Sequence, residues 1–347
     1  MSLGGGTFKS FTKVIPGVYT NVKGSPIIKE MPTRGYVAVA VPLKWGDAGF
    51  TTVFASEIEE TCMEVFGYDY SDNEMTWLRE IIAGGATVIY VYNLNSSGAK
   101  ATGTFCTAKK AGTRGNDIKI TIEEQSDDSF DVILYVGTTL VDTQNVTNSA
   151  ALKDNAYVTY DKTATLAETS QTTLTTGADG TVATTAHETF LNACESKYIN
   201  VIVCNSTDAT VTALYAEYAK KFVEETALKT QVAIYQKEAD FYGTLDVYHP
   251  AASDGPLGVS GFTFWFAGAI AGLLPGECLT NKKYTGELKA GTTYTNAQLK
   301  THITNGHLVF NVIDDELKVA KEVNSLTTFT EEIGKSYALN QHIRIIN

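Results

Sequence analysis

The sequence predicts an α/β fold in which a mixed sheet carries helices on both faces, with a small all-β unit inserted into it. Short apolar runs alternate with helical patterns before residue 97 and again after residue 180. Strands that alternate with helices are typical of a parallel sheet covered on both faces. Between these two stretches the hydrophobic period changes to two residues, as in half-buried strands. We therefore expect three parts: an extended N-terminal arm at residues 1–24, a discontinuous α/β core at residues 25–97 and 181–347, and an inserted β domain at residues 98–180.

The composition describes a globular, acidic protein. Of its 347 residues, 44% are hydrophobic and 19% are charged, which is enough apolar surface for a sizeable core. The formal net charge of −12 disfavours direct binding to nucleic acid or to an anionic membrane. The N-terminus lacks the apolar segment of a signal peptide. The five scattered cysteines contain no C-x-x-C pair and predict free thiols in a reducing cytoplasm.

The first α/β stretch reads as strand, helix, helix, strand. Residues 35–43 alternate valine with alanine and predict a strand, and residues 56–66 predict a helix with glutamates in its first turn. We expect Asp72 to cap a second helix that stops at Gly84-Gly85. Residues 86–92 then predict the next strand.

The inserted β domain is predicted from two alternating rows. Ile118, Ile120 and Ile122 alternate with polar residues, and residues 130–136 repeat this pattern. The threonine-rich stretch at residues 163–185 is interpreted as a linker that closes the unit.

The second α/β stretch begins at Thr184. The patterns predict these elements in order: a helix at 187–196, a buried strand at 198–204, a long helix at 208–226, a short buried strand at 231–235, and an apolar helix at 262–274 ended by Pro275-Gly276. The last of these is too short for the roughly 20 residues that span a bilayer, so we interpret it as a buried helix.

The N-terminal segment is apolar but interrupted by Pro16-Gly17, which breaks any helix there. We expect Val14, Ile15, Val18 and Tyr19 to belong to an extended arm that links one subunit to the next. The alternative is that these side chains pack on their own core.

A search for metal-ligating residues finds one constellation, His302 and His307 near Asp314 and Asp315. The histidine spacing does not match an i, i+4 helical pair, and an Asn305-Gly306 turn lies between them. We interpret both as surface or turn histidines and predict no metal site and no cofactor.

A search for a hydrolase finds Ser260 in the sequence GVSG, one residue short of the G-x-S-x-G nucleophile motif. Asp254 and His249 lie close in sequence, but a catalytic triad is defined by geometry. The alternative is that the protein is an α/β hydrolase with an appended β-sandwich binding domain. It would then hydrolyse an ester or peptide substrate, and Ser260→Ala would abolish this activity.

Two further segments invite a binding interpretation. Residues 112–117 (GTRGND) lack the lysine of a phosphate loop and precede a predicted strand, so we interpret them as a turn that leads into that strand. The acidic residues around position 127 lack EF-hand spacing and predict a solvated hairpin end.

Several motifs together resemble the tail sheath proteins of contractile phages and defective prophages of Gram-positive bacteria. They occur in family order along the chain: GGTF at 5–8, PGVY at 16–19, RGYV at 34–37, LKWG at 43–46, GTRGNDI at 112–118, FWFAGAIAG at 264–272, NSLTTFT at 324–330 and NQHIRII at 340–346. No single motif is decisive, but their shared order favours this family over a chance match.

The resemblance implies a structural protein without enzymatic activity, whose core has subtilisin-like topology. It implies a helical homo-oligomer that surrounds a tail tube protein, meets baseplate and tail terminator proteins, and contracts to drive the tube through a cell envelope. It also implies a place in the virion tail or a tail-like particle, assembled in the host bacterial cytoplasm, with no nucleic-acid partner and no membrane insertion. Many members continue past the segment that matches residues 340–346 into a C-terminal subdomain and linking arm. A non-contractile surface or adhesion protein is a third possibility and would require an export signal.

Overall fold

The computed structural model describes residues 34–328, apart from positions 47, 96, 227, 275 and 315. The predicted arm residues Val14, Ile15, Val18 and Tyr19 lie outside the described residues, as do the motifs at 5–19 and 340–346.

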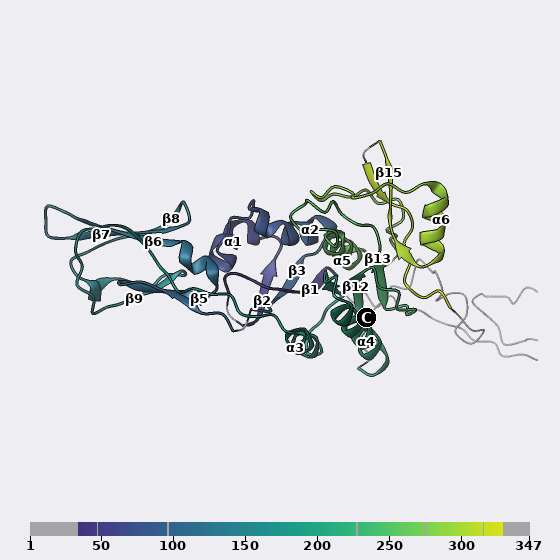
Figure 1. Cartoon of the computed structure of the whole chain (residues 1–347), viewed down its shortest axis with the longest axis horizontal. Helices are drawn as coiled ribbons and strands as arrows, with labels where there is room; N and C mark the ends of the chain where they lie inside the picture. Colours follow the sequence, from purple (N-terminus) through teal and green to yellow (C-terminus); the bar gives the residue numbers. More distant parts are fainter. Residues whose placement is uncertain are drawn as a thin grey trace, which may run out of the picture. The chain divides into compact units, whose positions relative to one another are not determined.

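A seven-stranded sheet forms the centre of the α/β core (Figure 1). All neighbouring strands in it run parallel except β2, which is antiparallel to β3. The strands, in their order across the sheet, are β14 (His307–Leu308), β13 (Thr244–Val247), β12 (Gln231–Tyr235), β11 (Val201–Cys204), β1 (Tyr36–Val41), β3 (Val88–Asn93) and β2 (Gly49–Phe54). The predicted mixed sheet is therefore present, and every residue of β11, β12 and β13 is buried.

Helices cover both faces of this sheet (Figure 1). In β1, Val37 and Val39 face one apolar cluster, whereas Ala38 and Ala40 face another, because successive side chains of a strand point to opposite faces. The first cluster contains α1 (Ile58–Phe66), α2 (Thr76–Gly84) and α5 (Phe262–Gly272), and the second contains α3 (Thr184–Cys194) and α4 (Ala209–Glu224). Burial on both faces explains why the central strands are continuous apolar runs.

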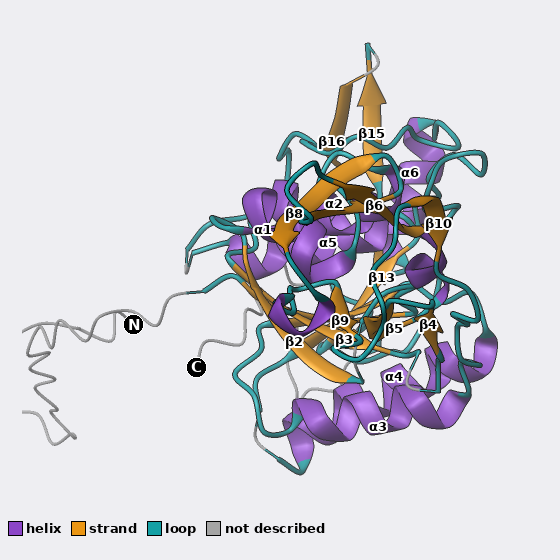
Figure 2. Ribbon diagram, turned by 90° about the vertical axis from the view of Figure 1, so that its left-hand side faces the viewer, coloured by secondary structure: helices purple, strands orange, loops and turns teal. Residues whose placement is uncertain are grey.

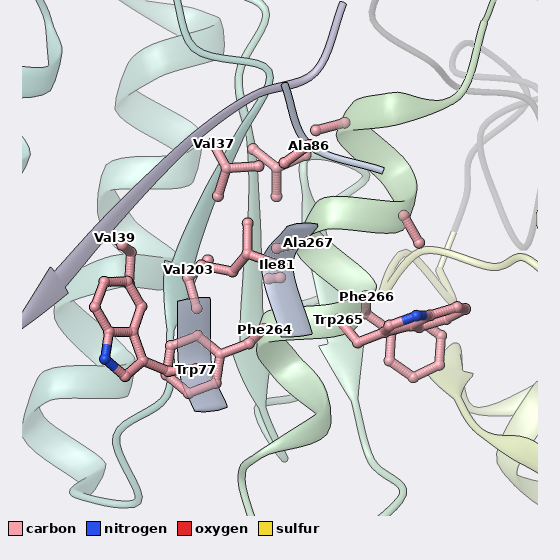
Figure 3. Packing of buried hydrophobic residues seen from close by; sticks show 14 of the residues in the cluster. Val37, Val39, Trp77, Ile81, Ala86, Val203, Phe264, Trp265, Phe266 and Ala267 are labelled. Carbon is pink, nitrogen blue, oxygen red and sulfur yellow. The ribbon is translucent and has the colours of Figure 1, made fainter. Parts of the chain in front are cut away.

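Helix α5 lies within the first cluster and is apolar all round, with ten of its eleven residues buried. It packs against α2 through glycines rather than through interlocking side chains. A Cβ atom on Gly268 would lie 2.0 Å from the carbonyl oxygen of Ile81, and one on Gly84 would lie 2.5 Å from the nitrogen of Ala269. The two backbones therefore touch at these glycines. Phe264, Trp265 and the neighbouring apolar side chains fill the remaining space (Figure 3).

Helix ends match the predictions to different degrees. Asp208 caps α4, since its carboxylate accepts hydrogen bonds from the backbone N–H groups of Thr210 and Val211. The prediction that Asp72 caps the second helix is wrong. Its carboxylate accepts instead from the N–H of Asp69, and a 3₁₀ turn (Asn73–Met75) precedes α2. Helix α5 ends at Gly272, before the expected Pro275-Gly276 stop.

The strands from Lys100 to Thr173 form two sheets that share no strand with the central sheet, and they enclose a third apolar cluster. The four-stranded sheet has the order β10 (Thr169–Thr173), β6 (Ile118–Glu124), β7 (Phe130–Val136) and β8 (Thr139–Val146). The three-stranded sheet has the order β4 (Lys100–Thr102), β5 (Cys106–Ala111) and β9 (Val158–Tyr160), and short 3₁₀ turns lie at Thr113–Asp117 and Ser149–Ala151.

The alternation in this β unit is confirmed, because Ile118, Ile120 and Ile122 are buried between partly exposed neighbours. The interpretation of residues 163–185 as a linker is wrong. Part of this stretch forms β10, which pairs antiparallel with β6, and its end is the first turn of α3. Threonine is a good strand former, so the composition that suggested a linker suits an edge strand equally well.

The last part of the described chain contains elements that the patterns do not predict. Helix α6 (Asn296–Thr304) precedes β14, and β15 (Phe310–Ile313) pairs with β16 (Glu316–Val319) as an antiparallel hairpin. Figure 2 shows this hairpin standing away from the other strands.

Gly268→Ala tests the backbone contact between α5 and α2. A methyl group at this position overlaps the Ile81 carbonyl, so one helix must shift. We expect a loss of about 3 kcal/mol in the free energy of unfolding, measured by urea denaturation. Gly255→Ala is the control, because the nearest atom to its Cβ position lies 3.1 Å away, and this variant should lose far less. Equal losses in the two variants would contradict the packing argument.

Candidate functional site

The junction between the β unit and the α/β core contains the motif at residues 112–117. Gly112 follows β5 and adopts a φ of 124°, and a Cβ atom there would lie 2.0 Å from the carbonyl oxygen of Lys44. This close approach admits only glycine. One residue earlier, Ala111 forms an antiparallel bridge to Gly46. The motif thus begins where a strand of the β unit touches the segment that follows β1.

Arg114 joins the two parts most directly. Its Nε donates to the carbonyl of Gly67 at 2.7 Å, and its Nη1 donates to the Asp117 carboxylate at 2.9 Å. The guanidinium also lies over the ring of Tyr68, 4.3 Å from its centroid. One side chain of the β unit is therefore held by the loop after α1, through a planar fork that lysine does not offer.

The chain segment that returns from the β unit is tied to the same motif. The N–H and the hydroxyl of Thr113 both donate to the carboxylate of Asp179, at 2.8 and 2.9 Å. The amide of Asn116 bonds in both directions with the backbone of Gly177. Asn95, on the outgoing segment, donates to Asp179 at 3.2 Å. The outgoing and returning segments, which connect the β unit to the core, are consequently linked to each other as well as to the turn.

Apolar packing reinforces these polar contacts. Trp45 comes from the core segment after β1, but its buried side chain belongs to the apolar cluster of the β unit. Met63 of α1 packs against the same cluster. The polar and apolar contacts together fix the orientation of the β unit on the core. The sequence patterns correctly predict a turn before a strand at residues 112–117, but they do not predict the contacts of Arg114 with Gly67 and Tyr68, which lie more than 40 positions away.

The candidate hydrolase residues do not form a catalytic arrangement. His249 Nε2 lies 3.1 Å from the carbonyl oxygen of Thr292, and its Nδ1 accepts from the N–H of Phe310 at 3.3 Å. Both ring nitrogens therefore bond to backbone groups, which leaves neither for Ser260. Burial lowers the pKa of His249 to about 4. The geometry gives the hydrolase alternative no support.

The interpretation of His302 and His307 as surface or turn histidines is wrong for His307. It lies in β14 and is buried, and its Nδ1 lies 3.1 Å from that of His302. A strand of only two residues, directly after the Asn305-Gly306 turn, shows no hydrophobic period by which it could be predicted. Within the described residues no group of three or more histidine, cysteine, aspartate or glutamate side chains is placed to hold a metal ion.

The acidic residues near position 127 lie at the hairpin between β6 and β7. Asp127 accepts hydrogen bonds from Ser129, and Asp131 accepts from Gln125 and Asn145. These local bonds fit the predicted hairpin end. None of the helices in the described part of the chain is long and apolar enough to cross a membrane.

Comparison with known proteins identifies the family. The profile of the phage tail sheath protein beta-sandwich domain matches residues 96–179, and the profile of the phage tail sheath protein central domain matches residues 180–325. Together these two matches cover most of the chain, which belongs to the phage tail sheath protein family. The resemblance inferred from the sequence motifs is confirmed.

Solved structures and curated relatives agree with this assignment. The sheath tail protein of Desulfitobacterium hafniense is 33% identical, with a TM-score of 0.83 over 95% of this chain and 80% of that chain. The sheath tail protein of Listeria innocua is 29% identical, with a TM-score of 0.74 over 88% of this chain and 72% of that chain. The phage-like element PBSX protein XkdK of Bacillus subtilis is 29% identical over 99% of this chain and 80% of its own length.

Arg114→Ala and Arg114→Lys test the junction. Either change removes the guanidinium fork that joins Gly67 to Asp117, so we expect a loss of about 2 kcal/mol in the free energy of unfolding, with lysine restoring little of it. Urea denaturation measures the loss. The control Lys300→Ala removes an exposed cation of α6 and should change stability only slightly. Full stability of Arg114→Lys would show that charge alone, and not the fork, holds the junction.

Proposed function

We propose that this chain is the subunit of a contractile tail sheath, which polymerises helically around an inner tube and contracts to drive that tube through the target cell envelope. The observation that carries the proposal is the match of two sheath domain profiles in sequence along residues 96–325. The similarity of nearly the whole chain to sheath tail proteins of two bacteria supports it.

The proposed role is mechanical and not enzymatic. A sheath is a heterologous assembly, in which each subunit uses different patches head to tail and the contact does not close. Contraction is then a one-way change from a metastable array to a more stable one, with the energy held in subunit contacts. The bonds of Arg114 between the β unit and the core suit this role, because a subunit that moves as one body transmits displacement without absorbing it.

We propose the same division of the chain as the sequence predicts: a core of subtilisin-like topology at residues 25–97 and 181–347, an inserted domain at residues 98–180 that faces outwards, and an arm at residues 1–24. Two observations support the inserted domain. The strands from Lys100 to Thr173 pair only with each other among the named strands, and the family profile for a beta-sandwich domain covers residues 96–179.

The arm is proposed to link subunits by adding a strand to a neighbour's sheet. Strand β2 is suited to receive it, because β2 ends the strand order and has β3 as its only partner strand among the described residues. An edge strand of this kind presents unpaired backbone groups that another chain can bind. Val14, Ile15, Val18 and Tyr19 of the arm would supply the apolar side chains of such a strand.

The proposed partners are further copies of this chain, the tail tube protein, and baseplate and tail terminator proteins. The proposed location is the tail of a virion or of a tail-like particle, after assembly in the bacterial cytoplasm. No cofactor is required by this mechanism.

Electron microscopy of the concentrated protein, in low and high salt, tests self-assembly. We expect striated tubes, because a heterologous contact that does not close produces a helical array. Dispersed particles under both conditions, and also in the presence of the tail tube protein, would contradict the proposal.

Deletion of residues 1–20 tests the linking arm. We expect tubes to be lost while the remaining protein stays folded, because the arm contributes contacts between subunits and not within one. Electron microscopy reports the tubes, and thermal unfolding reports the fold. Tubes that persist without residues 1–20 would show that the arm does not link subunits.

A further inference from the structure

A group of titratable side chains lies at one edge of the seven-stranded sheet. Asp246 of β13 and His307 of β14 are direct partners in the parallel register of these two strands. His302 lies on α6, which precedes β14 and packs against it. The turn between α6 and β14 contains Gly306 at a φ of 77°, where a Cβ atom would lie 2.6 Å from the carbonyl oxygen of Asn324. This glycine turn brings the two histidines together.

The two imidazoles face each other through the same ring atom. His302 Nδ1 and His307 Nδ1 lie 3.1 Å apart, which is a hydrogen-bond distance. One of these nitrogens must therefore carry a proton and donate a hydrogen bond, which the other nitrogen accepts. Tyr248 stacks on His307, with ring centroids 4.1 Å apart and planes 1° from parallel, and it also contacts His302. Tyr294 contacts the His302 ring with centroids 4.5 Å apart, so both rings are fixed in place.

The other nitrogen of His307 faces two carboxylates. His307 Nε2 lies 3.3 Å from Glu238 Oε1 and 3.7 Å from Asp246 Oδ2. Asp246 is only 1% exposed, and its Oδ1 accepts from the N–H of Lys237 at 3.0 Å. Its Oδ2 makes no hydrogen bond within the described part of the chain. A buried carboxylate oxygen without a hydrogen bond is costly and unusual, so this oxygen is placed to respond to the charge of His307.

We propose that Asp246, His307 and His302 form an acid-sensitive latch, which holds α6 against β14 at neutral pH and releases it when both imidazoles are protonated. The first proton is tolerated, since one imidazolium can still donate to a neutral partner. The second places an N–H against an N–H across 3.1 Å and two positive charges side by side, so the contact must open. Glu238, largely exposed, is the acidic group nearest to His307, and His249 and the tyrosines complete the titratable surroundings.

The charges at the site change in the direction that the latch requires. Burial raises the pKa of Asp246 to about 7, so acidification neutralises this carboxylate before the histidines are both charged. Burial lowers the pKa of His302 and of His307, so the folded protein resists their protonation. Acid therefore removes a negative charge and then forces positive charge into the same place.

The effects on global stability have opposite signs. The histidine pKa values lie below the unfolded value, so the stability they contribute is present above about pH 6.5 and is lost as the pH falls. The pKa of Asp246 is raised, so its contribution is present at low pH and is lost as the pH rises towards about 7. Because the two partly cancel, a global unfolding midpoint is a poor test and a local measurement is needed.

Hydrogen exchange of the full chain, followed by mass spectrometry, provides this measurement. Between about pH 7.5 and about pH 5, we expect exchange in α6, corrected for the intrinsic effect of pH, to rise by at least about tenfold. Exchange in α1 should change little and serves as the internal reference. Unchanged protection of α6 at the lower pH would overturn the proposal.

His302→Phe separates titration from packing, because it keeps a ring against Tyr248 and Tyr294 but has no nitrogen to protonate. We expect the response of α6 to pH to disappear in this variant. His302→Gln serves the same purpose if the phenylalanine variant does not fold. His187→Phe is the matched control, since His187 lies on α3 and bonds to Tyr215, and α6 should respond in it as in the unaltered chain. A full response in the His302 variants would overturn the proposal.

Discussion

The contact between the backbones of α2 and α5 is the constraint on which the core depends. Helix α5 has no polar face, so all of its sides must be covered by other elements. The sheet covers one side of α5, and α2 covers another. The backbones of α2 and α5 lie so close together at Gly268 that no room remains for even a methyl group. Dense packing of this kind tolerates little change in volume. The position of α2 in turn sets the loop after α1, to which the β unit is attached.

This chain of contacts explains how the β unit, which lies between β3 and α3 in the sequence, is held against the α/β core. Two crossing segments alone would form a flexible connection, because few residues link the two parts. Arg114 adds a bond to the loop after α1, Trp45 adds apolar packing, and Asp179 ties the returning segment to the turn. The β unit is thus anchored to the core at points that are distant in sequence, and a force applied to one part reaches the other.

Sequence patterns predict the elements whose environment is uniform. Residues 231–235 are buried on both faces, and the predicted strand matches β12 at both ends. The predicted helix at 208–226 begins at the residue that caps α4, and such a cap depends only on local backbone geometry. The sequence patterns do not predict an element whose formation depends on contacts with residues distant in the sequence. Strand β13 contains Asp246 within a fully buried run, and β14 has only two residues, so neither shows a hydrophobic period. The contacts of Arg114 with Gly67 and of His307 with Asp246 are likewise set by tertiary packing and leave no local signal.

Two buried carboxylates of the α/β core, those of Glu80 and Asp246, differ in the partners of their oxygens. Glu80 of α2 is fully buried, yet its Oε2 accepts from the hydroxyl of Tyr284 at 2.7 Å and its Oε1 accepts from the N–H of Glu287 at 2.6 Å. Each oxygen thus has a neutral donor, and the carboxylate ties α2 to the loop that follows α5. Asp246 is almost equally buried, but its Oδ2 makes no hydrogen bond within the described part of the chain and lies 3.7 Å from the Nε2 of His307. Donors from neutral groups stay in place at every pH, whereas an imidazole changes its charge near neutrality. The two sites are built from the same kind of residue, but of the two only Asp246 lies beside a side chain whose own charge changes with pH in this range.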